Sequence, residues 1–167
     1  MRLTNYSQSG FHNASQELSS GWFFAFYRII VFLIIVLTSS QMLKKLLLIF
    51  VASFLLNLIW ENLHSYLYVH YGGGEITQLI LLRATLFDAA FITLLAVPFI
   101  TLPYFRARKW YALIFGFVAA VLIEIYALNS GRWAYSSLMP VIPLLNTGLT
   151  PSIQLGLLSY LILKRLA

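Results

Sequence analysis

Long apolar runs separated by short polar segments dominate the sequence. A transmembrane helix needs about 20 consecutive, mostly apolar residues to cross the hydrocarbon core of a bilayer. Four strong runs meet or approach this length, at residues 45–69, 76–103, 110–128 and 149–163. The pattern therefore predicts an all-α, polytopic membrane bundle of four strong transmembrane helices.

A fifth, weaker run covers residues 22–39, where Arg28 interrupts the apolar stretch early. This run predicts a first transmembrane helix within an N-terminal extension, residues 1–41. The four-helix core then comprises residues 42–167, and Met42 would be a plausible start for it. Both counts, four spans and five spans, stay open at this point.

Turn-forming residues mark the breaks between the runs. Gly72-Gly73-Gly74 follows the first strong run and predicts a hinge. Pro98 should kink the second run or begin its end, because proline cannot continue the hydrogen bonding of a helix. Asn129-Ser130-Gly131 ends the third run, and two prolines make residues 139–146 a stiff, non-helical connection.

The basic residues predict the orientation, because lysine and arginine concentrate in the short cytoplasmic loops of membrane proteins. They gather at every second break along the chain: Lys44, Lys45, Arg106, Arg108, Lys109, Lys164 and Arg165. Among lysines and arginines, the opposite loops contain only Arg132. The pattern predicts a multi-pass protein of a bacterial-type inner (plasma) membrane with a cytoplasmic C-terminus.

Composition supports the membrane interpretation. Hydrophobic residues make up 60% of the chain and charged residues only 10%, against roughly a quarter charged in soluble domains. The net charge of +6 comes from basic residues scattered at helix ends, so it does not indicate nucleic-acid binding. The absence of cysteine from the sequence excludes disulfides and thiolate catalysis.

Three of the five acidic residues fall within predicted spans: Glu61, Asp88 and Glu124. An ionisable side chain at the centre of a spanning helix costs about 2.5–3.5 kcal/mol on the insertion scale, so such residues indicate function. Asp88 lies twelve residues beyond Ile76, which is roughly 18 Å at 1.5 Å per residue and near the bilayer midplane.

A polar stripe runs along the first strong helix. Asn57, Glu61, His64 and Tyr68 follow one another at intervals of four, three and four residues, which places them on one helix face. The predicted topology brings further polar residues to a similar depth in the outer half of the membrane: Arg83, Glu124, Trp133, Tyr135 and Gln154. Asp88 is expected beneath them. We therefore predict one polar pocket, with Glu61, His64, Asp88 and Glu124 as catalytic residues.

The remaining members of the predicted pocket are expected to bind the substrate: Asn57, Arg83, Trp133, Tyr135 and Gln154. Arg83 could pair with Glu61 or Glu124 from another helix. The spacing Glu61-x-x-His64 also permits a mononuclear metal site with Glu124, although two-metal bundles need two such pairs and this chain has one. We predict neither a metal nor a cofactor.

A motif around the third and fourth strong helices resembles a known family. Glu124 is followed by Gly131-x-Trp133-x-Tyr135, by a proline-containing loop, and by Pro151-Ser152-Ile153-Gln154 at a helix start. This pattern resembles the small integral-membrane lycopene cyclases and related carotenoid-modifying proteins. In that family a helix acid precedes a Gly-x-Trp-x-Tyr segment, and a Pro-x-Glu-Glu motif opens a later helix.

The resemblance implies acid-initiated chemistry on a polyprenyl chain, with Glu124, Trp133 and Tyr135 at matching positions. Trp60-Glu61 is also similar to the Trp-Glu pair of membrane-bound meroterpenoid cyclases. Ile153 and Gln154 stand where the family has two acids. If those acids donate the family's proton, this chain either uses Glu61 or Glu124 instead or catalyses no cyclisation.

Three function classes follow from these residues. The first is an enzyme that protonates, isomerises, cyclises or hydrates an isoprenoid lipid, with the bilayer and that lipid as its partners. The second is a small proton-coupled transporter, which needs a polar path through both leaflets. The third is a structural or accessory subunit, in which polar residues hold helices together and small residues such as Gly116 and Ala120 could also serve a homodimer.

Overall fold

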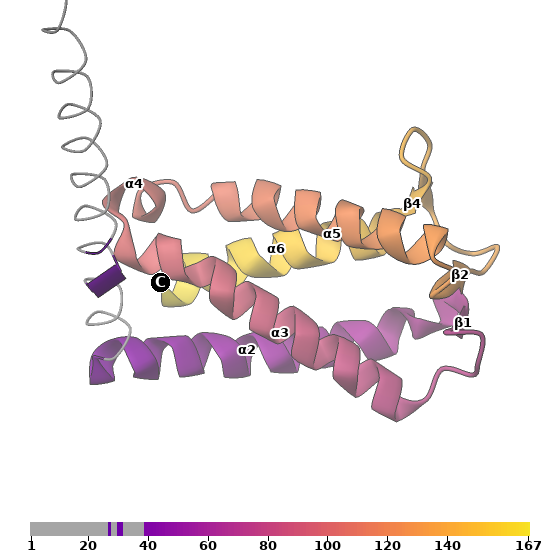
Figure 1. The fold of residues 1–167 in the computed structure, drawn as a ribbon, viewed down its shortest axis with the longest axis horizontal. Coiled ribbons are helices and arrows are strands. Elements are labelled where there is room, and N and C mark those ends of the chain that lie inside the picture. The colour runs from indigo at the N-terminus through magenta and orange to yellow at the C-terminus, as the bar shows by residue number, and fades with distance from the viewer. Residues whose placement is uncertain (1–26, 28–29, 32–38) are drawn as a thin grey trace, which may run out of the picture. The chain divides into compact units, whose positions relative to one another are not determined.

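The computed structural model describes residues 27, 30–31 and 39–167 (Figure 1). The predicted first span at residues 22–39, and most of the predicted extension, lie outside these residues. The chain divides into two compact units, Met1–Leu43 and Lys44–Ala167. In the first unit, Tyr27, Ile30 and Val31 are helical. The fold and the site described below belong to the second unit.

Four long helices form the second unit, with the first turn of α2 beginning just before it: α2 (Ser40–His64), α3 (Gln78–Thr101), α5 (Tyr111–Asn129) and α6 (Leu149–Leu166). They coincide with the four strong apolar runs to within five residues at each end. A short helix, α4 (Pro103–Arg106), connects α3 to α5. The prediction of a mostly helical protein with these helices is confirmed.

Three of these helices are long and apolar enough to cross a membrane: α2 with its continuation to Leu67, α3 and α5. Large apolar side chains point outward along them, and Leu63, Leu94 and Leu122 are 67%, 72% and 61% exposed. Outward-facing leucines of this kind are typical of helices that contact lipid. The described residues thus have the character of a membrane protein.

Helix α6 is not among those three helices, and its packing explains why. It lies against α5 and α3, and it places the polar side chains Ser152, Gln154 and Ser159 in buried positions. A helix that faces its neighbours rather than lipid can carry such residues, because other helices supply their contacts. Its mean hydropathy is lowered both by these buried polar residues and by Lys164 and Arg165, which are exposed in its last turn.

The contact between α5 and α6 depends on two glycines. A Cβ atom added to Gly116 would lie 2.6 Å from the Cα atom of Gly156, so the two backbones touch where side chains are absent. Ala112 and Ala120, one turn away on either side of Gly116, are also buried. The small-residue face of α5 is thus covered by α6 of the same chain, and a homodimer would need a different surface.

Replacing Gly116 with leucine is expected to lower the free energy of unfolding by about 2–3 kcal/mol, because the new side chain meets backbone that cannot move aside. Val118→Leu on the exposed face of the same helix is the control, and we expect it to be nearly neutral. Unfolding in detergent, followed by circular dichroism, measures both. Equal stability of the two variants would contradict this packing.

Proline and threonine set the limits of α3. Thr77 caps its start, since the Thr77 side chain accepts a hydrogen bond from the Ile80 amide at 3.4 Å. The helix continues through Pro98 and ends at Thr101, and Pro103 then opens α4. The expectation that Pro98 begins the end of this helix therefore agrees with the structure.

Four short strands connect the helices at one end of this unit, opposite α4 and the C-terminus (Figure 1). Strand β1 (Tyr68–Tyr71) pairs antiparallel with β2 (Trp133–Tyr135), and β3 (Val141–Ile142) pairs with β4 (Thr147–Gly148). The first pair joins the segment after α2 to the connection between α5 and α6.

The helix predicted over residues 45–69 is too long at its C-terminal end. Helix α2 ends at His64, and a 3-10 turn over Ser65–Leu67 leads into β1. The segment Tyr68–Tyr71 has two tyrosines, one on either side of Val69-His70, and tyrosine and valine are enriched in strands. Its partner strand is equally aromatic, with Tyr68 opposite Tyr135 and Tyr71 opposite Trp133, so cross-strand packing outweighs the helical continuation.

The glycine run after β1 forms a tight turn. Gly72 and Gly73 have φ angles of 60° and 80°, a region that residues with a Cβ rarely adopt. The Gly74 amide donates to the Tyr71 carbonyl at 3.1 Å. The turn directs the chain from β1 toward the start of α3.

Candidate functional site

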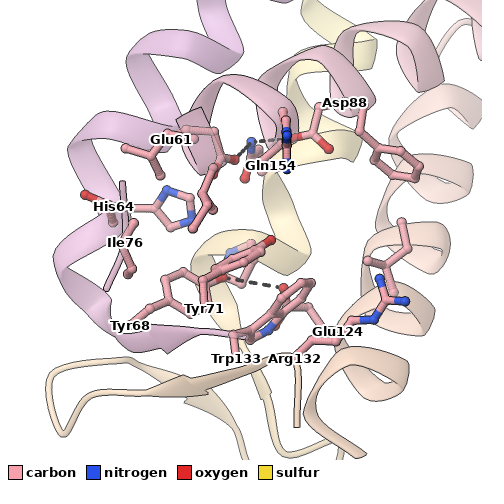
Figure 2. A pocket seen from close by; sticks show the side chains of 18 of the residues that line it. Glu61, His64, Tyr68, Tyr71, Ile76, Asp88, Glu124, Arg132, Trp133 and Gln154 are labelled. Atoms are coloured by element: carbon pink, nitrogen blue, oxygen red, sulfur yellow. Dashed lines mark hydrogen bonds between the residues drawn. The ribbon is translucent and has the colours of Figure 1, made fainter. Parts of the chain in front are cut away.

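A cavity of about 380 Å³ lies between the helices beneath the paired strands β1 and β2. Figure 2 shows it with acidic side chains on opposite sides and aromatic rings between them. Helices α2, α3, α5 and α6 and both strands contribute to its wall. Its polar lining consists of Glu61, His64, Ser65, Tyr68, Tyr71, Arg83, Asp88, Glu124, Arg132, Trp133 and Gln154.

Gln154 joins three helices on one side of the cavity. Its Nε2 atom lies 2.9 Å from Asn57 Oδ1, 2.7 Å from Glu61 Oε1 and 2.9 Å from Asp88 Oδ2. Asn57 in turn donates from Nδ2 to the Ser53 carbonyl at 2.8 Å. We call Asn57, Glu61, Asp88 and Gln154 the amide cluster. Figure 2 shows Gln154 between the two carboxyl groups.

Helix direction explains why these residues meet. Asn57 and Glu61 are one turn apart near the C-terminal end of α2, and Gln154 lies in the second turn of α6. Asp88 lies in the first half of α3. The C-terminal end of α2 and the N-terminal ends of α3 and α6 come together where the strands connect the helices (Figure 1).

Glu124, on α5, occupies the other side of the cavity and accepts hydrogen bonds from three side chains. The Tyr68 hydroxyl lies 3.4 Å from Oε1, and Trp133 Nε1 lies 3.3 Å from Oε2. The Tyr135 hydroxyl also donates to Oε2, while it accepts from the Gly148 amide at 2.7 Å. The paired strands β1 and β2 thus supply all three donors to one buried carboxyl group.

The tyrosines around Glu124 are held in their neutral, hydrogen-donating form. Burial, and then the nearby Glu124 carboxylate, raise the pKa of Tyr68 far above the ordinary value for tyrosine. Burial and the hydrogen bond to Glu124 likewise raise the pKa of Tyr135. Burial, together with Glu61, also raises the pKa of Tyr71. These phenols therefore remain donors across the neutral and mildly alkaline range.

His64 faces the cavity between the two acidic groups (Figure 2). Its Nδ1 atom lies 2.9 Å from the Trp60 carbonyl oxygen, and a carbonyl can only accept, so Nδ1 carries the hydrogen. The neutral ring then has a lone pair on Nε2. The His64 ring packs edge-on against Tyr68, with 5.6 Å between the centroids.

Aromatic rings form the wall between β1 and β2. Trp133 stacks on Tyr71 with 4.9 Å between the centroids, and it meets Tyr68 edge-on at 6.2 Å. Such faces attract a cation placed over them. The cavity therefore has one aromatic wall next to two groups of carboxyls.

The cavity opens beside α3. Phe87 lines it and is 57% exposed, and Arg83, one turn away, also lines it and is exposed. Arg132 is a second exposed cation in the lining, and it lies over the Tyr126 ring at 5.1 Å from the centroid. An opening that carries an exposed phenylalanine is suited to an apolar ligand.

The structure brings the predicted site residues together, with three corrections. Asp88 does not lie beneath Glu61 and Gln154, because its carboxyl group contacts the same Gln154 nitrogen as Glu61. Asn57 is fully buried and holds Gln154, so it does not face the cavity. The Tyr135 hydroxyl donates a hydrogen bond to Glu124. Tyr135 is likewise not part of the cavity lining.

Three of the polar lining residues were not predicted: Ser65, Tyr71 and Arg132. Tyr71 and Arg132 face the cavity because β1 pairs with β2, and strand pairing between distant segments leaves little trace in a single sequence. Tyr68 was predicted on the helical stripe and instead reaches the cavity from β1. Among residues 39–167, no three His, Asp or Glu side chains are grouped so as to hold a metal ion. The alternative site of Glu61, His64 and Glu124 is thus not formed.

Comparisons with protein-family models, with curated proteins and with solved structures found no match to this chain.

Proposed function

We propose that this protein is a membrane enzyme that acts on an isoprenoid lipid by protonation from a carboxylic acid. One observation carries the proposal: Glu61, Asp88 and Glu124 all face a single cavity that aromatic side chains also line. Carboxyl groups are expensive in a membrane and tend to be retained for chemistry. Aromatic faces next to them would stabilise the carbocation that forms when a carbon–carbon double bond is protonated.

The cavity suits one end of a long lipid. Its volume of about 380 Å³ lies near the lower limit of small-molecule pockets, which occupy roughly 300–1,000 Å³. A polyprenyl chain would place a terminal segment inside and leave the remainder in the bilayer. Exposed Phe87 at the opening supports entry from the side of α3.

The resemblance to the membrane lycopene cyclases supports the same chemistry at three positions. Glu124 matches the family's helix acid, and the residues that match its aromatic segment, Trp133 and Tyr135, both donate to Glu124. Gln154 replaces a family acid, yet it contacts the carboxyl groups of Glu61 and Asp88. The proposal therefore assigns the missing acid function to these two residues.

For the membrane arrangement, we propose that α6 crosses as a fourth span. Its 18 residues extend about 27 Å at 1.5 Å per residue, close to the roughly 30 Å hydrocarbon core. Lys164 and Arg165 in its last turn favour a cytoplasmic C-terminus. Residues 22–39 would add a fifth span.

The test is to purify the protein in mild detergent and identify co-purifying lipids by mass spectrometry. We expect an enriched isoprenoid whose mass or identity changes in Glu61→Gln and in Glu124→Gln, because each substitution removes a carboxyl group from the cavity. Glu75→Gln is the control, since Glu75 is exposed and lies outside the cavity. Bulk phospholipid alone, identical in all four proteins, would contradict the proposal.

A proton-coupled transporter is the second candidate, and two buried hydroxyls favour it. Ser53 and Ser159 are fully buried, and their Oγ atoms have no hydrogen-bond partner among the described residues. Ser53 lies one turn from Asn57 toward the other end of α2. Thr93 and Thr101, by contrast, are bonded to carbonyls of their own helix. Proton flux into liposomes that is lost in Ser53→Ala would favour a transporter over the enzyme.

A further inference from the structure

We propose that Glu61 and Asp88 share one proton and form the acid of the site, whereas Glu124 is a separate carboxylate that accepts a proton. The roles as donor and acceptor rest on the proposed function. The shared proton does not, because it follows from the positions of the two carboxyl groups around Gln154. Two observations support it.

The first observation is the number of hydrogens on Gln154. Its Nε2 atom carries two hydrogens, yet three acceptor oxygens lie within 2.9 Å of it, on Asn57, Glu61 and Asp88. Two hydrogens give at most two of these oxygens an unshared bond, so Gln154 alone does not supply all three fully. A proton on Glu61 or Asp88 removes one of the two negative charges that otherwise meet at this nitrogen.

The second observation is the short distance between the carboxyl groups themselves. Glu61 Oε1 and Asp88 Oδ2 lie 2.7 Å and 2.9 Å from the same nitrogen, so these two oxygens are at most 5.6 Å apart. Two adjacent carboxylates in an apolar site repel each other when both are ionised, and carboxyl pairs of this kind hold one proton between them.

Glu124 differs because three donors already supply its oxygens with hydrogens. Tyr68, Trp133 and Tyr135 all donate to it, so it needs no proton of its own to satisfy its hydrogen bonding. The Glu61–Asp88 pair and Glu124 thus have different surroundings within one cavity. Such a difference allows one carboxyl group to act as the acid and the other as the base.

The O–H bond of the shared carboxyl breaks, and the proton bonds to one carbon of a double bond through its π electrons. The neighbouring carbon becomes a cation over the aromatic wall, or it is attacked by a second double bond of the same chain. Glu124 then removes a proton from an adjacent carbon, and the C–H electrons form a new double bond. No oxidant or reductant is consumed, and the product is an isomer of the substrate.

The proton must then return from Glu124 to the amide cluster. His64 and Tyr68 lie between the two groups (Figure 2), and Tyr68 is already bonded to Glu124. The lone pair on His64 Nε2 faces the cavity and can take a proton. These two side chains therefore provide a route for the return.

Infrared difference spectroscopy tests the shared proton without any substrate. At neutral pH we expect the carbonyl band of a protonated carboxylic acid in the wild-type protein, with a shift on exchange into deuterated water. The band should be lost or shifted in both Glu61→Gln and Asp88→Asn. It should be unchanged in Glu124→Gln and in the control Glu75→Gln. Two separate variants probe the pair, so poor folding of one leaves the other informative.

Absence of the band from the wild-type protein would overturn the inference. So would a band that survives in both Glu61→Gln and Asp88→Asn, or one that disappears only in Glu124→Gln, because the proton would then lie elsewhere. If the band behaves as expected but no lipid is converted, the shared proton stands and the proposed enzymatic function fails. The two claims are thus tested by different readouts.

Discussion

Gln154→Leu is expected to lower the free energy of unfolding by about 3 kcal/mol, a large fraction of the stability of a small domain. Its side chain is the hydrogen-bond donor that Asn57, Glu61 and Asp88 have in common. Leucine fills similar space but leaves those buried oxygens without that donor. Each unsatisfied buried polar group costs about 1–3 kcal/mol, and relaxation of the cluster offsets part of the sum.

Unfolding in detergent at a series of denaturant concentrations measures this loss. Gln78→Leu is the matched control. It is the same glutamine-to-leucine change, made at an exposed position at the start of α3. We expect the control to change the unfolding free energy by less than about 0.5 kcal/mol. A loss below about 1 kcal/mol in Gln154→Leu would mean that the amide cluster does not hold α2, α3 and α6 together.

Glu124→Gln is expected to reduce the rate of product formation by about 10²–10⁴-fold, the usual contribution of a positioned acid or base. Glutamine keeps the shape of the side chain but cannot accept a proton from carbon. Tyr135→Phe should have a smaller effect, about tenfold, because it removes one of three donors to Glu124 and one such bond is worth about 1.4 kcal/mol.

Product formation by the purified variants, measured with the lipid that co-purifies, checks both values. Tyr66→Phe is the control, since Tyr66 is 66% exposed and lies outside the cavity. The order of effects matters as much as their size. If Tyr135→Phe were as harmful as Glu124→Gln, the phenol rather than the carboxyl group would be the reacting group.

The helices were predictable because their signal is local. Each apolar run has the length of a spanning helix and ends at glycine, proline or charged residues. The stripe of Asn57, Glu61 and His64 also survives in α2, because spacing on a regular helix fixes which residues share a face. Alternating helix direction then brought Glu124 and Gln154 to the same end of the bundle, as predicted.

The details of the cluster could not be predicted in the same way. Counting residues from Ile76 placed Asp88 beneath Glu61, but helices cross at angles and side chains reach several ångströms along the axis. Gln154 therefore contacts both residues. The pairing of β1 with β2 joins residues more than sixty positions apart, and no local pattern in the sequence specifies that register.

The role of Gly116 shows a similar limit. The sequence predicted a small-residue packing face, and the structure confirms that the face is used for close helix packing. Which helix would cover it was not specified, because glycine on α5 suits any close neighbour. Gly156 on α6 provides that neighbour within the chain.

The central claim is that a carboxyl group in this cavity protonates a double bond of an isoprenoid lipid. The most direct test is to repeat the mass spectrometry of co-purifying lipids after incubation in deuterated water. The account predicts deuterium bound to carbon in the lipid from the wild-type protein, and none above background in Glu61→Gln. Lipid without carbon-bound deuterium in the wild-type protein, or equal labelling in both proteins, would contradict it.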